Sequence, residues 1–280
     1  MTLGAGCAWF DEKQRRLIYR PTPGRPTGFD GLREGDEAFA REIVIDQPVD
    51  MIEGDEAPVG SVHSVRMWWL PHPDVNAPAL LYLHGTFRNL YQNLPKIDAL
   101  REAGFAVLAV DYRGWGSSTP IVPSEHTINQ DAALAWRELC ARVPDPARRV
   151  IYGHSMGGGV AVELASRLRH GTDYAGLIVE STFTRLPDVA RSAGWFAGWL
   201  GRLSTQRFDS IDRIAKVDAP VLVLHGRRDD TVPIELGQRL FDAAREPKRF
   251  VALDGGHSRL QQDAPLAYRT AIGEFVAALR

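Results

Sequence analysis

Ser155 lies between two glycines, in the run Gly-His-Ser-Met-Gly at residues 153–157. A short apolar run at 150–152 precedes it and a helical pattern begins at Met156, which places the serine at a strand-to-helix turn. A turn this sharp brings the flanking chain so close that side chains at the two glycine positions would collide. It also lifts the hydroxyl above the edge of a sheet, where it can act as a nucleophile. An ordinary serine in a glycine-rich turn is the alternative.

A serine hydroxyl needs a base to take its proton, and that base is usually a histidine held by a carboxylate. On a sheet of this kind the three residues follow one another as serine, acid and histidine, each after its own strand. Asp229 and Asp230 follow the apolar run 221–224, and His257 follows the last such run, 250–253, after two glycines. We expect His257 to be the base, and we favour Asp229 over Asp230 as the acid. Two solvated acids paired with neighbouring arginines are the alternative.

Acyl transfer also needs N–H donors for a developing oxyanion. The Met156 N–H is one candidate, because it lies at a helix N-terminus, where negative charge is favoured. The Thr86 N–H is the second, because Gly85 lets the chain turn inward after a core strand; a plain strand-to-loop turn is the alternative. His84 and His225 end strands and precede glycines, so we expect structural hydrogen bonds from both.

Eight short apolar runs alternate with helical stretches from about residue 41 to residue 280, which we expect to form one domain. These runs are 43–45, 62–70, 79–84, 105–110, 150–152, 177–179, 221–224 and 250–253. Several are apolar at successive positions, as in strands buried between two helix layers, whereas 62–70 is mixed and predicts an antiparallel strand near the edge. Helices are predicted over 128–142 (with Thr127 as N-cap), 156–168, 235–244 and 265–279. This alternation predicts a doubly wound, mostly parallel α/β sheet, in which ligands bind at the carboxyl ends of strands.

Two segments lie outside this alternation. Residues 1–40 show no period and contain a cluster of prolines and glycines, so we expect a surface loop that wraps the body. Residues 182–219 must bridge two strands over the site, and Trp195, Phe196 and Trp199 share one apolar helical face there. We expect a small helical lid whose apolar face binds an acyl chain. Simple packing of this helix on the sheet is the alternative.

Composition argues against several classes of protein. The chain has 280 residues, with 33 Lys+Arg against 35 Asp+Glu, and no basic block that would fit a nucleic acid. Cys7 and Cys140 lie far apart, without the spacing of a disulfide framework or a metal site. No apolar run is long enough to span a bilayer. Residues 3–7, Leu-Gly-Ala-Gly-Cys, are similar to the end of a lipoprotein signal but lack its apolar stretch. We expect a cytoplasmic protein; a truncated start would instead allow a membrane-associated or exported one.

Together these motifs resemble the α/β-hydrolase superfamily, over nearly the whole chain from about residue 15. The resemblance is carried by residues 16–21 (RLIYRP), His84-Gly85, 111–118 (DYRGWGSS), the Ser155 turn, 180–184 (ESTFT), 225–233 (HGRRDDTVP) and Gly255-Gly256-His257. Within the superfamily the chain is similar to BEM46-like and ABHD13-like serine hydrolases, which are related to serine aminopeptidase-like hydrolases. In that family the acid is the fourth residue after the motif's histidine, which matches Asp229. Residues 84–89 depart from the family, since they read His-Gly-Thr-Phe-Arg-Asn where His-Gly-Asn-Ala-Gly-Asn is more common.

The resemblance implies the α/β-hydrolase fold and a serine hydrolase of the carboxylesterase type that needs no cofactor. In the expected mechanism Ser155 attacks an acyl carbonyl while His257, steadied by Asp229, accepts its proton. The N–H groups of Thr86 and Met156 hold the oxyanion, and water then releases the acyl group.

Other activities remain open. The same side chains would serve an aminopeptidase-like amide hydrolase or a thioesterase, and a binding protein on a hydrolase scaffold is a further alternative. A dehalogenase or epoxide hydrolase is disfavoured, because such relatives have an aspartate in place of Ser155. Arg88 and Arg113 near the mouth of the site would favour an anionic group. The expected partner is a small acyl substrate, and the oligomeric state is left open.

Overall fold

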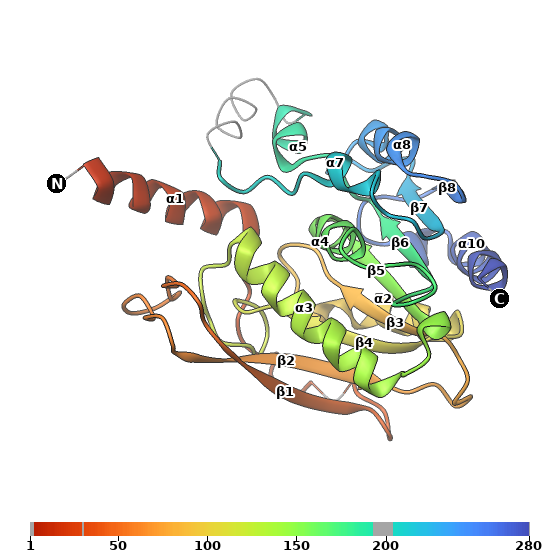
Figure 1. Ribbon diagram of the computed structural model, residues 1–280, viewed down its shortest axis with the longest axis horizontal. Coiled ribbons are helices and arrows are strands. Elements are labelled where there is room, and N and C mark those ends of the chain that lie inside the picture. Colours follow the sequence, from red (N-terminus) through yellow and green to blue (C-terminus); the bar gives the residue numbers. More distant parts are fainter. Residues whose placement is uncertain (1–2, 30, 193–203, 280) are drawn as a thin grey trace.

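The computed structural model describes residues 3–29, 31–192 and 204–279 (Figure 1). Within these ranges eight strands form one sheet in the order β1-β2-β4-β3-β5-β6-β7-β8. The strands are β1 (Glu37–Val44), β2 (Val62–Leu70), β3 (Ala79–Leu83), β4 (Ala106–Asp111), β5 (Arg149–His154), β6 (Gly176–Glu180), β7 (Val221–Gly226) and β8 (Lys248–Leu253). Each of the eight predicted apolar runs falls on one of them. The strands from β4 to β8 in this order are parallel neighbours, and β2 is antiparallel to both β1 and β4, so the predicted doubly wound sheet is confirmed.

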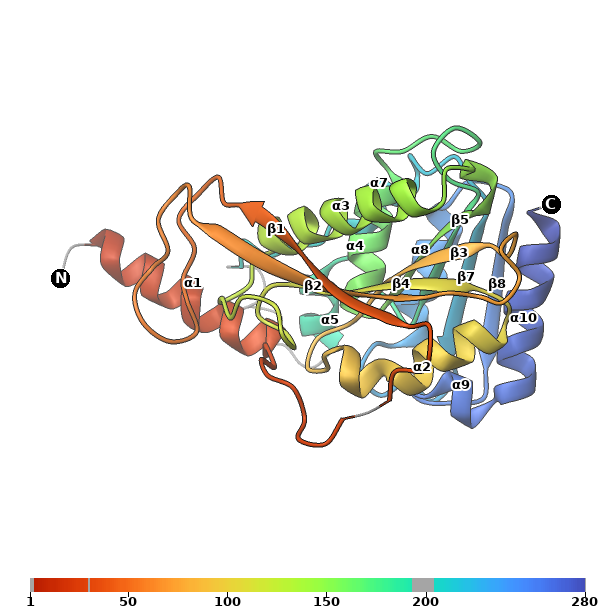
Figure 2. The ribbon, with the colours of Figure 1, turned by 90° about the horizontal axis from the view of Figure 1, so that it is seen from below.

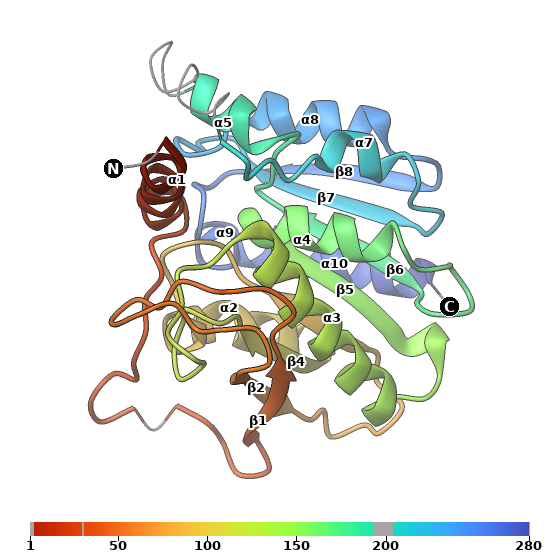
Figure 3. The same cartoon turned by 60° about the vertical axis from the view of Figure 1, so that its left-hand side comes forward.

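Helices cover both faces of the sheet. The α-helices of the described residues are α1 (Leu3–Tyr19), α2 (Leu90–Glu102), α3 (Glu125–Arg142), α4 (Met156–Ala165), α5 (Leu186–Ser192), α7 (Ser210–Ile214), α8 (Ile234–Ala243), α9 (Leu260–Asp263) and α10 (Pro265–Ala278). Figure 3 shows α3, α4, α7 and α8 on one face and α2, α9 and α10 on the other, and each layer packs on its own apolar core. Successive residues of the central strands enter opposite cores, which is why those strands are apolar without alternation.

Two helices differ from the prediction. Helix α3 begins about one turn earlier than expected, because Ser124 rather than Thr127 is its N-cap. The Thr127 N–H donates to the Ser124 hydroxyl over 3.2 Å, and the Ser124 N–H donates to the Thr127 hydroxyl over 2.9 Å, which completes a capping box. Helix α2 was not predicted, since Pro95 inside it obscures the helical pattern.

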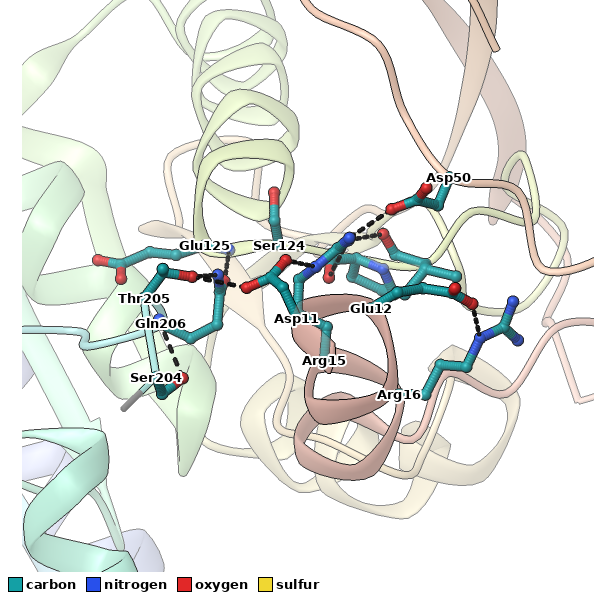
Figure 4. Close-up of polar contacts among 12 residues, drawn as sticks. Asp11, Glu12, Arg15, Arg16, Asp50, Ser124, Glu125, Ser204, Thr205 and Gln206 are labelled. Carbon is teal, nitrogen blue, oxygen red and sulfur yellow. Dashed lines mark hydrogen bonds and ion pairs between the residues drawn. The ribbon is translucent and has the colours of Figure 1, made fainter. Parts of the chain in front are cut away.

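The prediction of a loop over residues 1–40 is wrong at both ends, because 3–19 form α1 and 37–40 belong to β1. Figure 1 shows α1 extending from the body of the molecule, and Figure 4 shows that its inner side is tied down by polar contacts. Arg15 pairs with Asp11 and Asp50, and Thr205 donates to Asp11 over 2.9 Å. A helix held by charged and polar contacts shows no apolar period, so the sequence pattern missed it. No helix in the described part of the chain combines the length and the apolar character that crossing a membrane requires.

Candidate active site

Ser155 lies at the sharp turn between β5 and α4, with φ at 55° and ψ at −121°. Its N–H donates to the Glu180 carbonyl over 2.9 Å, and its own carbonyl accepts from the Thr182 hydroxyl over 2.8 Å. A β-carbon on Gly153 or on Gly157 would come closer than 3.0 Å to neighbouring backbone, which real β-carbons do not do. The predicted collision at both glycines is therefore found, and it explains why the sharp turn at Ser155 needs glycine at these two positions.

We expect Gly157→Ala to lower the free energy of unfolding by about 3 kcal/mol or more, since the new methyl group would overlap the β3 backbone. The matched control is Gly273→Ala on α10, where a β-carbon meets nothing within 4 Å. There the same substitution should raise stability by about 0.5–1 kcal/mol, because alanine favours a helix. Urea unfolding of both variants measures the difference, and equal midpoints would contradict the tight turn.

The structure brings Ser155, His257 and Asp229 together from the ends of three strands. His257 Nε2 lies 3.0 Å from Ser155 Oγ, and its Nδ1 lies 2.8 and 3.0 Å from the two carboxylate oxygens of Asp229. The Asp229 side chain is fully buried, and its Oδ1 also accepts the N–H groups of Thr231 and Val232. Asp230 is exposed, and the carboxylate that contacts the His257 ring is that of Asp229.

Hydrogen bonds keep Asp229 ionised. Burial alone would raise the pKa of its carboxyl, but hydrogen bonds from His225 and His257 outweigh burial and hold that pKa well below the usual range. At pH values above the ordinary pKa of an aspartate, ionised Asp229 therefore stabilises the folded protein. This stabilisation is lost as the pH falls through the lower pKa that the carboxyl has in the folded state. A carboxylate at Nδ1 places the ring proton there, which leaves Nε2 of His257 free to accept the serine proton.

His225 helps to hold the Asp229 carboxylate in place, and it has the structural role that the sequence predicted for it. It is fully buried, and its Nε2 donates to the Val232 carbonyl over 2.9 Å. The same nitrogen lies 3.4 Å from Asp229 Oδ2, a contact that the sequence reading did not predict. The pattern His-Gly-x-x-Asp carries this signal, because a turn of that length returns the acid to its own histidine.

His154 holds the loop that carries His257. Its Nε2 donates to the His257 carbonyl over 3.0 Å, and the two rings lie 5.2 Å apart. Burial, followed by repulsion from Lys96, lowers the pKa of His154 to about 3, so the ring is neutral and Nε2 carries its proton. His154 was excluded as the base from the sequence, and its contact with His257 was not predicted.

Lys96 and Glu180 form a buried ion pair close to His154. Lys96 and Glu180 are at most 3% exposed and pair directly, and the hydroxyls of Tyr152 and Tyr268 donate to the second oxygen of Glu180. Burial would raise the pKa of Glu180, but the charge of Lys96 and the hydrogen bonds from Lys96 and Tyr152 outweigh burial and lower that pKa, so the carboxylate stays charged. Because the Glu180 carbonyl also accepts the Ser155 N–H, this network fixes the strand ends that carry the serine. Neither Lys96 nor the role of Glu180 was predicted.

A small pocket of about 30 Å³ opens beside Ser155. Its lining residues are Gly85, Thr86, Phe87, Arg88, Asn93, His154, Ser155, His257 and Ser258. Thr86 and Ser155 thus line the same pocket, and Met156 is the first residue of α4. Arg88 lines the pocket, but Arg113 does not: it is fully buried and paired with Asp131 at 2.8 Å, so its expected place at the mouth is wrong. His84 is also buried, with Nδ1 2.7 Å from the Gly85 carbonyl, as its structural role predicted.

The segment expected to form the lid is only partly described. Trp195, Phe196 and Trp199 lie outside the described residues, which include α5 before them and α7 after them. The Cys7 side chain is likewise not described, and Cys140 is free and partly buried. Among the described residues, no cluster of His, Cys, Asp and Glu could hold a metal ion.

Known proteins resemble the chain in sequence and in fold. A family model described as serine aminopeptidase, S33, matches residues 76–212. An uncharacterised protein of Mycobacterium tuberculosis is 37% identical over 251 residues, covering 88% of this chain and 81% of that protein. Lysophosphatidylserine lipase ABHD12 of Danio rerio is 34% identical over 198 residues, covering 65% of this chain and 51% of the lipase. An esterase of Pyrococcus furiosus superposes with a TM-score of 0.68 at 19% identity, covering 93% of this chain and 98% of the esterase.

These similarities bear on different questions. The structural likeness, at 19% identity, supports the fold alone. The sequence relatives extend the likeness to the segment that carries Ser155 and its turn. With the eight-stranded sheet and the strand-turn-helix at Ser155, they agree with the family resemblance of the motifs. The chain belongs to the α/β-hydrolase superfamily.

Proposed function

We propose that the protein is a serine hydrolase that cleaves carboxylic esters, with Ser155 as nucleophile, His257 as base and Asp229 as the acid that orients it. The observation that carries the proposal is the continuous hydrogen-bonded chain from Ser155 Oγ through the His257 ring to the buried Asp229 carboxylate. These contacts are within the reach required for proton transfer, and the ionised acid favours the protonated ring that forms during the reaction.

The reaction proceeds in two halves. Ser155 Oγ forms a bond to the acyl carbon while its proton passes to His257 Nε2, and the carbonyl oxygen becomes an oxyanion. We assign the oxyanion to the N–H groups of Thr86 and Met156. Collapse of this intermediate breaks the ester C–O bond, and the imidazolium returns its proton to the leaving alcohol. Water, deprotonated by His257, then attacks the acyl-enzyme and releases the acid and Ser155.

One similarity favours an ester over other acyl groups, because the sequence relatives include a lysophosphatidylserine lipase. We further propose that Trp195, Phe196 and Trp199 bind the acyl chain, and that Arg88, which lines the pocket, faces an anionic part of the substrate. The matching family model is described as a serine aminopeptidase, so an amide hydrolase is the second candidate.

A fluorophosphonate probe and a substrate panel test the proposal. We expect the probe to label Ser155, and we expect a short p-nitrophenyl ester to be hydrolysed faster than a matched thioester or aminoacyl p-nitroanilide. A faster reaction with the anilide would move the assignment to amide hydrolysis. A folded protein that neither reacts with the probe nor turns over any of these substrates would be a binding protein on a hydrolase scaffold.

A further inference from the structure

The loop that carries Thr86 has a strained backbone. The Arg88 N–H donates to the Thr86 carbonyl over 3.0 Å, two residues back, and Phe87 between them has φ at +70°. These are the features of the rare γ-turn, whose central residue is strained. A bulky side chain at positive φ costs free energy and persists only when its surroundings hold it in place. The contacts that hold Phe87 therefore decide how this loop lies beside Ser155.

The N-terminal segment supplies those contacts. The Thr22 hydroxyl donates to the Phe87 carbonyl over 2.8 Å, and the Arg20 guanidinium lies 4.8 Å from the centre of the Phe87 ring. The Asn89 amide donates to the carbonyls of Thr22 and Gly24, at 3.2 and 3.3 Å. We call residues 20–24 the strap. The strap thus contacts the central residue of the γ-turn and the residue that follows the turn.

The strap is itself anchored at both ends. At its far end the Gly24 N–H donates to the Gly116 carbonyl over 2.6 Å, and the Gly116 N–H donates to the Thr22 carbonyl over 2.9 Å. At its near end it continues from α1, which is tied to the body through Arg15 (Figure 4). Figure 2 shows the segment after α1 passing the start of α2, where the loop ends. The strap is therefore held independently of the loop that it contacts.

We propose that the strap positions the oxyanion loop, with Thr22 as its principal positioning residue. This inference rests on the proposed function, in which the Thr86 N–H stabilises the oxyanion. The hydroxyl of Thr22 fixes the Phe87 carbonyl, and the γ-turn passes this constraint to Thr86, one residue earlier. Because an oxyanion donor acts in the transition state and not on the bound substrate, a loosened loop lowers kcat and leaves KM nearly unchanged.

Thr22→Val tests the proposal, since valine keeps the shape of threonine and removes the donor. We expect kcat for a short p-nitrophenyl ester to fall about tenfold, the effect of one lost hydrogen bond on the transition state, with little change in KM. Thr22→Ser restores the hydroxyl and should stay within about twofold of wild type. Thr172→Val is the matched control, because Thr172 is exposed and precedes β6 at the opposite end of the sheet. Its kcat should equal that of the wild type.

Hydrogen exchange of the same variants separates this inference from the proposed function. Thr22→Val should speed amide exchange over residues 83–93 and leave 150–160 unchanged, whereas Thr172→Val should change neither. Unchanged exchange or unchanged kcat in Thr22→Val would overturn the inference, as would a loss that appears in KM. If the wild type hydrolyses none of the esters, the proposed function fails, and the exchange result still decides whether the strap orders the loop.

Discussion

Ser155→Ala is expected to reduce hydrolysis of a short p-nitrophenyl ester by about ten-thousand-fold or more, and to abolish fluorophosphonate labelling. Without Oγ no acyl-enzyme forms, and His257 has no hydroxyl to activate. A small residual rate above that of water would remain, because the oxyanion donors and the pocket still bind the transition state. Initial rates at several enzyme concentrations, together with mass spectrometry of the labelled protein, measure both effects.

Ser166→Ala is the matched control for this variant. Ser166 caps the opposite end of α4, where its hydroxyl donates to the Glu163 carbonyl over 2.8 Å. Its loss should leave kcat/KM and labelling at the wild-type level. Both variants should unfold at nearly the wild-type temperature, since neither removes much buried apolar surface. Full activity in Ser155→Ala would end the assignment of Ser155 and require another nucleophile.

The second large effect is expected for Asp229→Asn, which should lower kcat by about a thousand- to ten-thousand-fold. An asparagine at this buried position carries no charge to stabilise the protonated His257 ring. Its amide also accepts less well from Nδ1–H, so the ring loses the tautomer that leaves Nε2 free for Ser155. The pH–rate profile of the variant should change with it, because the histidine loses its anionic neighbour.

Asp230→Asn is the matched control, one residue further along the same loop. Asp230 is exposed, and its carboxylate accepts a hydrogen bond from the Thr231 hydroxyl over 3.3 Å. We expect kcat/KM of this variant within about twofold of wild type, as for most exposed substitutions. The reverse order, with Asp230→Asn inactive and Asp229→Asn active, would show that the working carboxylate is not the one hydrogen-bonded to His257 in the structure.

The sequence predicted well those features of the structure that depend on residues adjacent in the chain. Each of the eight strands was predicted at least in part, and the central strands gave the clearest signal, because burial between two helix layers leaves a mark on every residue. The turn at Ser155 was predicted from two glycines whose β-carbons would collide with backbone. By contrast, α1 was missed because polar pairs such as Arg15 with Asp50 hold it, and Pro95 obscured α2.

The sequence by itself determined the sheet, the sharp turn at Ser155 and the order in which Asp229 and His257 follow it, since each depends on neighbouring residues in the chain. Only the tertiary structure shows that the Asp229 side chain is buried against His257, and that Arg113 is paired with Asp131 instead of lying at the mouth. The contact of Thr22 with the loop at Phe87 joins segments 65 residues apart and leaves no periodic trace. Such contacts are fixed by how the chain packs in space, and a linear pattern of residue types does not record them.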